Sequence, residues 1–506
     1  MEIETSMTVA KIVIVFIVNF YICISIDARK PNIVLVLTDD QDLLVGGLTP
    51  VKQVQQLIAN QGATFTNAFV STPICCPSRS TILTGLYQHN HRVVNNSLSG
   101  GCSGESWQQH LEPYNFGTTL QDNGYTTFYA GKYLNTYGYK AAGGTKHVPK
   151  GWHWWLGLVG NSRYYNYTLS INGTAQHFTD QYLTNVIEKY SVDFLENMRH
   201  KENESFLMVL APPAPHAPFT PETKYRGKYN GIKVPRTPNF NTHKLKNRHW
   251  LLNMGVAPLP KETVARVDSY YARRWETLLS VDDMVASNIN KLTDIGQLDN
   301  TYIIYTSDHG YHLGQFSLPW DKRQPYETDI RVPLLLRGPG VRGKSLVEGV
   351  VVNVDIAPTI LAMAGLQPPT YMDGRSFLSM ATSVEPLPPR RAFLIEYVGE
   401  GDLKTVSSSC HFADAYTLSE CSPSSSCKCQ DALNNTYNCV RSIAHDENYI
   451  YCEFYKEVGY LKEFYDINQD PYQMENIYQE LQQTVKNKLK EEILQHTTCN
   501  GRSCCK

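Results

Sequence analysis

The chain has 506 residues, which is long enough for one large domain and a smaller one. Hydrophobic residues make up 42% and charged residues 19%, an ordinary globular composition that excludes a disordered or membrane-saturated protein. The formal net charge is −2, with 46 basic and 48 acidic residues, so no overall field favours a nucleic acid and we expect no such partner.

The N-terminal residues 1–28 are expected to be a signal peptide. Lys11 precedes an apolar run that persists to about Ile26. This run is shorter than the roughly 20 residues that a membrane span needs, although an uncleaved anchor is the alternative. No other stretch approaches a transmembrane segment, so we expect no membrane span in the mature chain.

Cysteine usage agrees with the secretory pathway. Eight of the 13 cysteines fall between Cys410 and Cys504, and Cys505 adds a ninth. Their close spacing could suggest zinc, but without histidines at ligand spacing disulfides are favoured. Five Asn-x-Ser/Thr sequons are expected to carry glycans. They are Asn95, Asn166, Asn172, Asn203 and Asn434.

Apolar runs alternate with helical patterns along the first two thirds of the chain, which predicts an α/β fold with a largely parallel sheet and helices on both faces. Strands are predicted over 31–38, 64–70, 125–130, 206–211, 301–306 and 332–336. Helices are predicted over 182–198, 266–292 and 355–364.

Four of these strands end in charged or imidazole side chains. The groups are Asp39 with Asp40, Lys132, His216, and Asp308 with His309. Any one of them could belong to a polar turn, but the carboxyl ends of parallel strands meet at one edge of a sheet. Several carboxylates at one point repel each other unless a cation lies between them, so a hard metal ion is predicted there.

The stretch 73–85 places Cys75 and Cys76 just before Pro77-Ser78, which reads as a helix start, and Gly85 as its end. A cysteine at a helix N-terminus near Arg79 lies in a positive potential that favours a reactive or anionic form. The alternative is that one of these cysteines is half of a disulfide.

A proline-rich break at 385–389 marks a domain edge. We expect a catalytic domain over 29–385 and a smaller, disulfide-rich domain over 386–506. Short strands near 393–397, 440–441 and 449–451 and a helix near 481–494 predict an antiparallel sheet with one helix.

Taken together, these residues resemble the sulfatase family over nearly the full length of the chain. Residues 75–79 match its Cys-x-Pro-Ser-Arg signature, and the Asp-Asp, Gly-Lys, Pro-His and Ser-Asp partners follow in order. The resemblance implies an alkaline-phosphatase-like sandwich, with a large mostly parallel sheet flanked by helices and a smaller C-terminal domain with an antiparallel sheet.

The resemblance also implies the roles of the site residues. Cys75 would be converted to formylglycine by the formylglycine-generating enzyme and act as the nucleophile. The modified Cys75 would bind Ca²⁺ together with Asp39, Asp40, Asp308 and His309. The other catalytic residues would be Arg79, Lys132, His216 and Lys322.

Two positions depart from the pattern of the family. His309 stands where many members have Asn, and Leu134 stands where many have a histidine two residues after the lysine. His91 or His312 could replace that missing imidazole as a substrate-binding group. With Cys23 removed and Cys75 modified, 11 cysteines remain, and a free Cys76 would leave ten for up to five bridges.

Within the family, the likeness is greatest to members that remove the 6-O-sulfate of N-acetylglucosamine from heparan and keratan sulfate. It implies an exo-acting enzyme with a sulfated glycosaminoglycan substrate. The enzyme would be destined for the lysosome, with secretion as the alternative, and the resemblance does not indicate its oligomeric state. One alternative is an extracellular heparan sulfate endosulfatase, but its long basic insertion has no counterpart here. Another is a catalytically silent glycan-binding protein in which Cys75 stays a thiol.

Overall fold

The computed structural model describes residues 29–201, 203–242, 246–382, 390–456 and 460–505. The predicted signal peptide and the proline-rich break at 385–389 lie outside these residues. No helix within them combines the length and apolar character that a membrane crossing requires.

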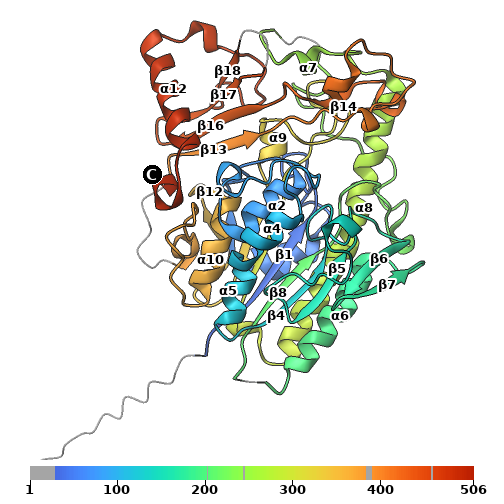
Figure 1. The fold of residues 1–506 in the computed structure, drawn as a ribbon, viewed down its shortest axis with the longest axis vertical. Helices are drawn as coiled ribbons and strands as arrows, with labels where there is room; N and C mark the ends of the chain where they lie inside the picture. Colours follow the sequence, from blue (N-terminus) through green and yellow to red (C-terminus); the bar gives the residue numbers. More distant parts are fainter. Residues whose placement is uncertain (1–28, 202, 243–245, 383–389, 457–459, 506) are drawn as a thin grey trace, which may run out of the picture.

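A ten-stranded sheet forms the body of the molecule (Figure 1). Its central strands run parallel, as predicted, whereas β10 and the strands of the β6 and β7 edge introduce antiparallel pairs, so the sheet is mixed. In spatial order the strands are β11 (Ser345–Val347), β2 (Ala63–Phe65), β10 (Leu334–Arg337), β9 (Thr301–Ser307), β1 (Asn32–Thr38), β8 (Phe206–Ala211), β4 (Thr126–Gly131), β5 (Trp154–Leu158), β6 (Tyr167–Ile171) and β7 (Thr174–Phe178).

Helices cover both faces of this sheet because its central strands are apolar on both sides. On β1, Ile33, Leu35 and Leu37 belong to one buried cluster, and Val34 and Val36 belong to the other. The first cluster includes residues of α2 (Cys75–Thr84), α5 (Phe116–Asp122) and α10 (Ile356–Met363). The second includes residues of α6 (Leu183–Met198) and α8 (Lys261–Asp294).

The C-terminal segment forms a separate antiparallel sheet, which lies above the large sheet in Figure 1. Its strands, in spatial order, are β13 (Ala392–Tyr397), β16 (Tyr437–Ala444), β17 (Glu447–Phe454) and β18 (Leu461–Asp466). Helix α12 (Gln483–Thr497) packs on this sheet, and a hairpin of β14 (Leu418–Cys421) and β15 (Cys429–Ala432) projects from it. The predicted α/β fold with a second, antiparallel sheet is therefore confirmed.

Two local predictions need correction. The single strand predicted over 64–70 is broken into β2 and β3 (Ala68–Phe69), and β3 pairs with β12 (Val351–Val352) in a small sheet of its own. Cys76 is not free but is bonded to Cys102, which lies far from it in sequence. Four further disulfides bind the C-terminal segment. Among the cysteines whose side chains the structure describes, Cys75 alone is unpaired.

Candidate active site

Helix α2 places Cys75 at its first position, two residues before the Pro77-Ser78 pair where the sequence predicted the start. The helix ends at Gly85, whose φ of +71° lies in the left-handed region that favours glycine. The hydroxyl of Ser78 donates to the backbone carbonyl of Asp308. This hydrogen bond joins the start of α2 to the end of β9.

Three carboxylates converge at the carboxyl ends of β1 and β9. The two strands are parallel neighbours, so Asp39 and Asp40 emerge beside Asp308. The backbone N–H of Asp40 donates to Oδ1 of Asp308 over 3.0 Å. All three side chains are buried, and one carboxylate oxygen from each lies within 4.8 Å of the others.

Each of these carboxylates has a different lysine or arginine within 3 Å. The three cations come from different elements, and the sequence predicted all of them as site residues. Lys132 Nζ lies 2.8 Å from both oxygens of Asp39, Lys322 Nζ lies 2.9 Å from both oxygens of Asp40, and Arg79 Nε lies 2.8 Å from Oδ2 of Asp308.

The Cys75 thiol is buried beside these charges. Burial raises its pKa, but the charges of Lys132 and Lys322 outweigh burial, and the pKa lies well below its usual value. His309 Nε2 lies 3.4 Å from Cys75 Sγ. His309 Nδ1 donates to the carbonyl of Gly310 over 2.9 Å, so the ring is oriented with Nε2 toward the thiol. Position 75 is therefore polarised for a nucleophilic role.

The carboxylate cluster fits a divalent cation. Burial raises the pKa of Asp308 to about 6, and the charge of Asp39 adds to the rise although Arg79 opposes it. A positive ion between the carboxylates would relieve this cost, and oxygen ligands are those that Ca²⁺ or Mg²⁺ prefers. His309 Nε2 lies 3.4 Å from Oδ1 of Asp40 and adds a nitrogen donor to the oxygen set.

His216 faces the same cluster from the loop after β8. Its Nδ1 donates to the carbonyl of Ala217 over 2.6 Å, and its Nε2 lies 3.9 Å from Oδ2 of Asp40. Burial lowers the pKa of His216, but Asp40 and Asp39 outweigh burial and raise it. The ring can therefore hold a proton on Nε2 at the point where a bound substrate would lie.

A cavity of about 980 Å³ opens over the cluster, with Asp40, His216 and Lys322 among its lining residues. Its size is that of a binding site for a small molecule. The loop 96–99 forms one part of its wall, and the C-terminal segment forms another. The lining residues from that segment are Glu400, Asp402, Thr405, Ser419, Glu420, Ser422, Ser425 and Gln430.

Three further residues at the site have no signal in the sequence. The hydroxyl of Ser162 donates to Asp39. Arg274, within α8, donates to the backbone carbonyl of Asp40 over 2.6 Å. Arg323 Nη2 lies 3.4 Å from Oε2 of Glu400 in the cavity wall. Only their distant partners in the fold identify these residues.

The structure does not bring His91 or His312 to the charged cluster. Val93 N–H donates to Nδ1 of His91, whose Nε2 therefore donates to the hydroxyl of Thr81, and burial lowers the pKa of His91 to about 3. His312 is buried and its Nδ1 lies 3.0 Å from the carboxylate of Asp329. Both rings are engaged within the protein, and a substrate-binding role of His91 or His312 stays a prediction.

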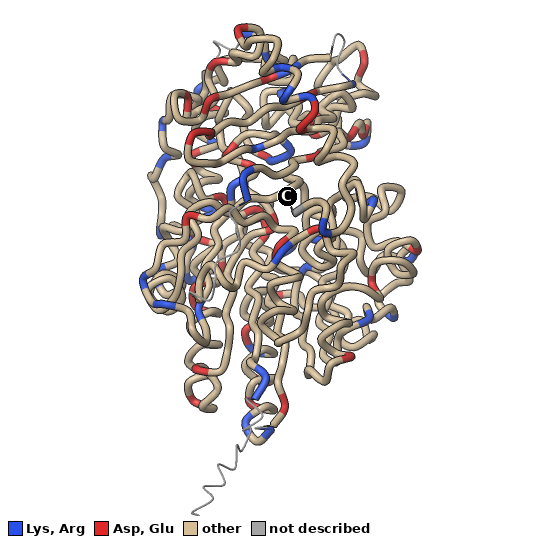
Figure 2. The backbone as a smooth tube through the Cα atoms, turned by 90° about the vertical axis from the view of Figure 1, so that its left-hand side faces the viewer, with Lys and Arg blue, Asp and Glu red and all other residues tan. Residues whose placement is uncertain are grey.

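Three of the predicted glycosylation positions, Asn166, Asn172 and Asn203, are exposed. Asn95 and Asn434 are half-buried. On the side of the molecule shown in Figure 2, acidic and basic positions are interspersed, in agreement with the small net charge.

A hydrolase of anionic esters is the class of protein that this sheet and this site define, because a polarised nucleophile position, a carboxylate cluster and several cations meet below one cavity. A family model described as Sulfatase matches residues 31–366. The chain belongs to the sulfatase family, whose members hydrolyse sulfate esters.

Similar proteins cover most of the chain. N-acetylglucosamine-6-sulfatase from Homo sapiens is 45% identical over 483 residues, which cover 94% of this chain and 86% of that protein. The protein of the same name from Capra hircus is 45% identical over 484 residues, covering 94% of this chain and 85% of that protein. An extracellular sulfatase SULF-1 homolog from Drosophila melanogaster is 40% identical over 360 residues, covering 70% of this chain and 32% of that protein.

The fold is also that of solved sulfatase structures. A protein in complex with its substrate D-glucosamine-2-N,6-O-disulfate superposes with a TM-score of 0.72 and covers 92% of this chain and 97% of its own. Its sequence is 22% identical, so the likeness concerns the fold.

Proposed function

We propose that this sulfatase removes the 6-O-sulfate of N-acetylglucosamine 6-sulfate at the ends of heparan sulfate and keratan sulfate chains. One observation carries the choice of substrate: 45% identity over 94% of the chain to N-acetylglucosamine-6-sulfatases. The similarity to an extracellular sulfatase covers only 70% of the chain, so a heparan sulfate endosulfatase is the less favoured of the two functions.

The proposed chemistry uses two groups that complete the site. A formylglycine hydrate at position 75 would supply an oxygen nucleophile. Asp39, Asp40, Asp308 and His309, with the modified residue 75, would hold a Ca²⁺ ion, which would lower the pKa of that nucleophile and neutralise sulfate oxygens. The hydroxyl oxygens of the modified residue would replace Cys75 Sγ, which lies 3.4 Å from His309 Nε2.

The side chains of the protein do the remaining work. Lys132 and Lys322 flank the cluster from two sides and would bind the sulfate oxygens by charge-assisted hydrogen bonds. Arg79 would orient the group at position 75 from within α2. His216 would donate its Nε2 proton to the sugar oxygen as the ester bond breaks, a role that its raised pKa supports.

We further propose that the chain enters the secretory pathway and functions in the lysosome, with secretion as the alternative. The formylglycine-generating enzyme would act on Cys75 during biosynthesis. The five disulfides among the residues that the structure describes are consistent with an oxidising compartment.

The test is hydrolysis of sulfated monosaccharides by the purified, modified protein. We expect sulfate release from N-acetylglucosamine 6-sulfate, and background release from its 3-sulfate isomer and from galactose 6-sulfate. Cys75→Ala should reduce release to background with an unchanged melting temperature. The mass of the peptide that contains residue 75 reports the modification, and an unmodified thiol in an active preparation would refute the nucleophile.

A further inference from the structure

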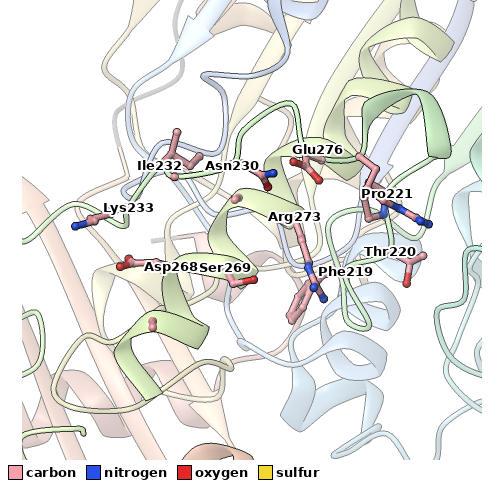
Figure 3. Close-up of a pocket in the computed structure, with 15 residues that line it drawn as sticks. Phe219, Thr220, Pro221, Asn230, Ile232, Lys233, Asp268, Ser269, Arg273 and Glu276 are labelled. Carbon is pink, nitrogen blue, oxygen red and sulfur yellow. The ribbon is translucent and has the colours of Figure 1, made fainter. Parts of the chain in front are cut away.

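A second cavity, of about 680 Å³, lies between helix α8 and the loop 219–233 (Figure 3). We call it the basic groove. Its cations are Arg226 and Lys233 on the loop and Arg273 on α8, and all three side chains are exposed. Part of this loop lies in the run 224–236, which has five basic residues and no acidic residue and which Glu222 of the loop precedes.

The three cations of the basic groove are free to bind a ligand. Within the described residues, none of Arg226, Lys233 and Arg273 forms an ion pair. The acidic side chains of the groove are engaged instead. Asp268 pairs with Arg236, with 2.6 Å between Oδ2 and Nη2, and accepts a hydrogen bond from the backbone.

The other acidic residue of the groove, Glu276, is buried and accepts a hydrogen bond from the backbone N–H of Tyr229 over 3.1 Å. The exposed charge of the groove is therefore mainly positive. Unpaired cations of one sign around a hollow concentrate anions there.

The basic groove lies next to the catalytic cavity. Phe219 lines the groove and Tyr311 lines the catalytic cavity, and their ring centroids are 6.3 Å apart. The backbone N–H of Phe219 also donates to the carbonyl of His216 over 3.2 Å. One layer of aromatic rings thus separates the two cavities.

We propose that the basic groove is a second, non-catalytic binding site for a sulfated glycan chain. Guanidinium groups bind oxyanions through paired N–H donors, as Arg226 and Arg273 could do with sulfate groups. The amide of Asn230 and the hydroxyl of Ser269 also line the groove and can bind sugar hydroxyls. The choice of a sulfated glycan, rather than another polyanion, rests on the proposed function.

The experiment measures binding to the full-length Cys75→Ala protein, so that no turnover interferes. The probe is a fluorescent heparin-derived oligosaccharide of defined length, titrated at several salt concentrations. We expect the triple variant R226A/K233A/R273A to bind at least about tenfold more weakly and to lower the slope of log affinity against log salt concentration by about 2 to 3. The matched control removes three other exposed cations, K150A/R342A/K490A, and should bind as the parent does.

Any of three results would refute the proposed site. The triple variant could bind with the affinity of the parent, the control variant could lose as much affinity as the triple variant, or the parent could bind a chemically desulfated oligosaccharide as tightly as the sulfated one. If the triple variant does not fold, Lys233→Gln repeats the test with a smaller expected loss. If binding depends on the basic groove but the protein with an intact, modified residue 75 does not hydrolyse N-acetylglucosamine 6-sulfate, the proposed function is refuted and the binding site is supported. Hydrolysis with groove-independent binding would refute the site alone.

Discussion

Two lysines at the active site share their partners with the proposed metal ion. Lys132 and Lys322 each contact both oxygens of one buried carboxylate, Asp39 and Asp40 respectively. A cation bound by those carboxylates would compete for the same oxygens, which would release the ammonium groups toward a sulfate. The burial of these lysines therefore suits a binding role as well as a structural one.

Lys322→Ala should separate the two roles. We expect kcat/KM for N-acetylglucosamine 6-sulfate to fall by about 10²- to 10³-fold, because one charged donor to the transition state is lost. Lys189→Ala is the control, since Lys189 is an exposed lysine on α6 that is paired with Asp193. Steady-state kinetics and thermal unfolding of both variants measure the effect, and a kcat/KM equal to that of the parent would remove Lys322 from the site.

At the scale of the elements, hydrogen bonds between segments that are distant in sequence hold the elements around the site in place. Helix α3 (Gln88–His91) contacts β13 through His89, whose Nδ1 lies 3.0 Å from Glu396 Oε1. The Nε2 of His89 lies 3.0 Å from the carbonyl of Cys499, so one ring joins three segments. When both ring nitrogens carry protons, both can donate.

His89→Gln should therefore destabilise the protein in a pH-dependent way. Burial lowers the pKa of His89, but Glu396 outweighs burial and raises it above 6.5 in the folded state. The stabilisation is thus fully present below the unfolded-state pKa and is lost as pH rises through the folded-state pKa. Because the ring is partly exposed, we expect a loss of about 1 kcal/mol near pH 5.

Melting temperatures of the parent and His89→Gln across pH 5 to 9 measure this effect. The exposed His445 provides a control, because His445→Gln should leave the profile unchanged. A constant difference between the parent and His89→Gln at all pH values would contradict the ion pair.

The Cys76–Cys102 disulfide joins α2 to the loop that forms part of the cavity wall. Its cysteines are 26 residues apart in sequence, and Asn96 Oδ1 in the same loop accepts a hydrogen bond from Cys76 N–H over 2.8 Å. Replacing both cysteines by alanine should lower the free energy of unfolding by about 2 to 4 kcal/mol and raise KM. Replacing Cys499 and Cys504, which close a short loop, is the control and should leave KM unchanged.

The sequence predicts a helix or strand best where all residues of the run are buried or exposed in one regular pattern. The continuous apolar run of β1 predicts a strand buried on both faces, and its polar end predicts Asp39 and Asp40 at the site. Strand β7 escapes prediction, since it is mostly exposed and lacks an apolar pattern. Arg274 and the Cys76–Cys102 pair also escape it, because their partners are distant in sequence and only the fold brings them together.

At the scale of the whole molecule, the large sheet and the C-terminal sheet contribute to one buried cluster, which includes Leu35 of β1 and Ile395 of β13. Phe393 on β13 packs against Phe69 on β3, with ring centroids 5.0 Å apart, and both are buried. Arg441 on β16 pairs with Glu327 of α9 (Glu327–Ile330) over 2.8 Å. A domain boundary near residue 385 stays a prediction, and these contacts indicate that the parts on either side of it unfold together.

Leu489→Ala tests this cooperativity. Leu489 on α12 is buried in the cluster between that helix and the antiparallel sheet, so its truncation should cost about 2 to 5 kcal/mol. All seven tryptophans lie between residues 107 and 320, before the predicted boundary. Trp250 packs against residues of β14 and β15, so the test uses a Trp250→Phe background, in which the other six tryptophans report on the part of the chain before that boundary. If the molecule unfolds as one unit, Leu489→Ala should lower the midpoint of the tryptophan transition, whereas Leu494→Ala, at a position of the same helix that is 61% exposed, should not. A tryptophan midpoint that Leu489→Ala leaves unchanged, while far-ultraviolet circular dichroism shows an earlier transition, would establish that the antiparallel sheet unfolds independently.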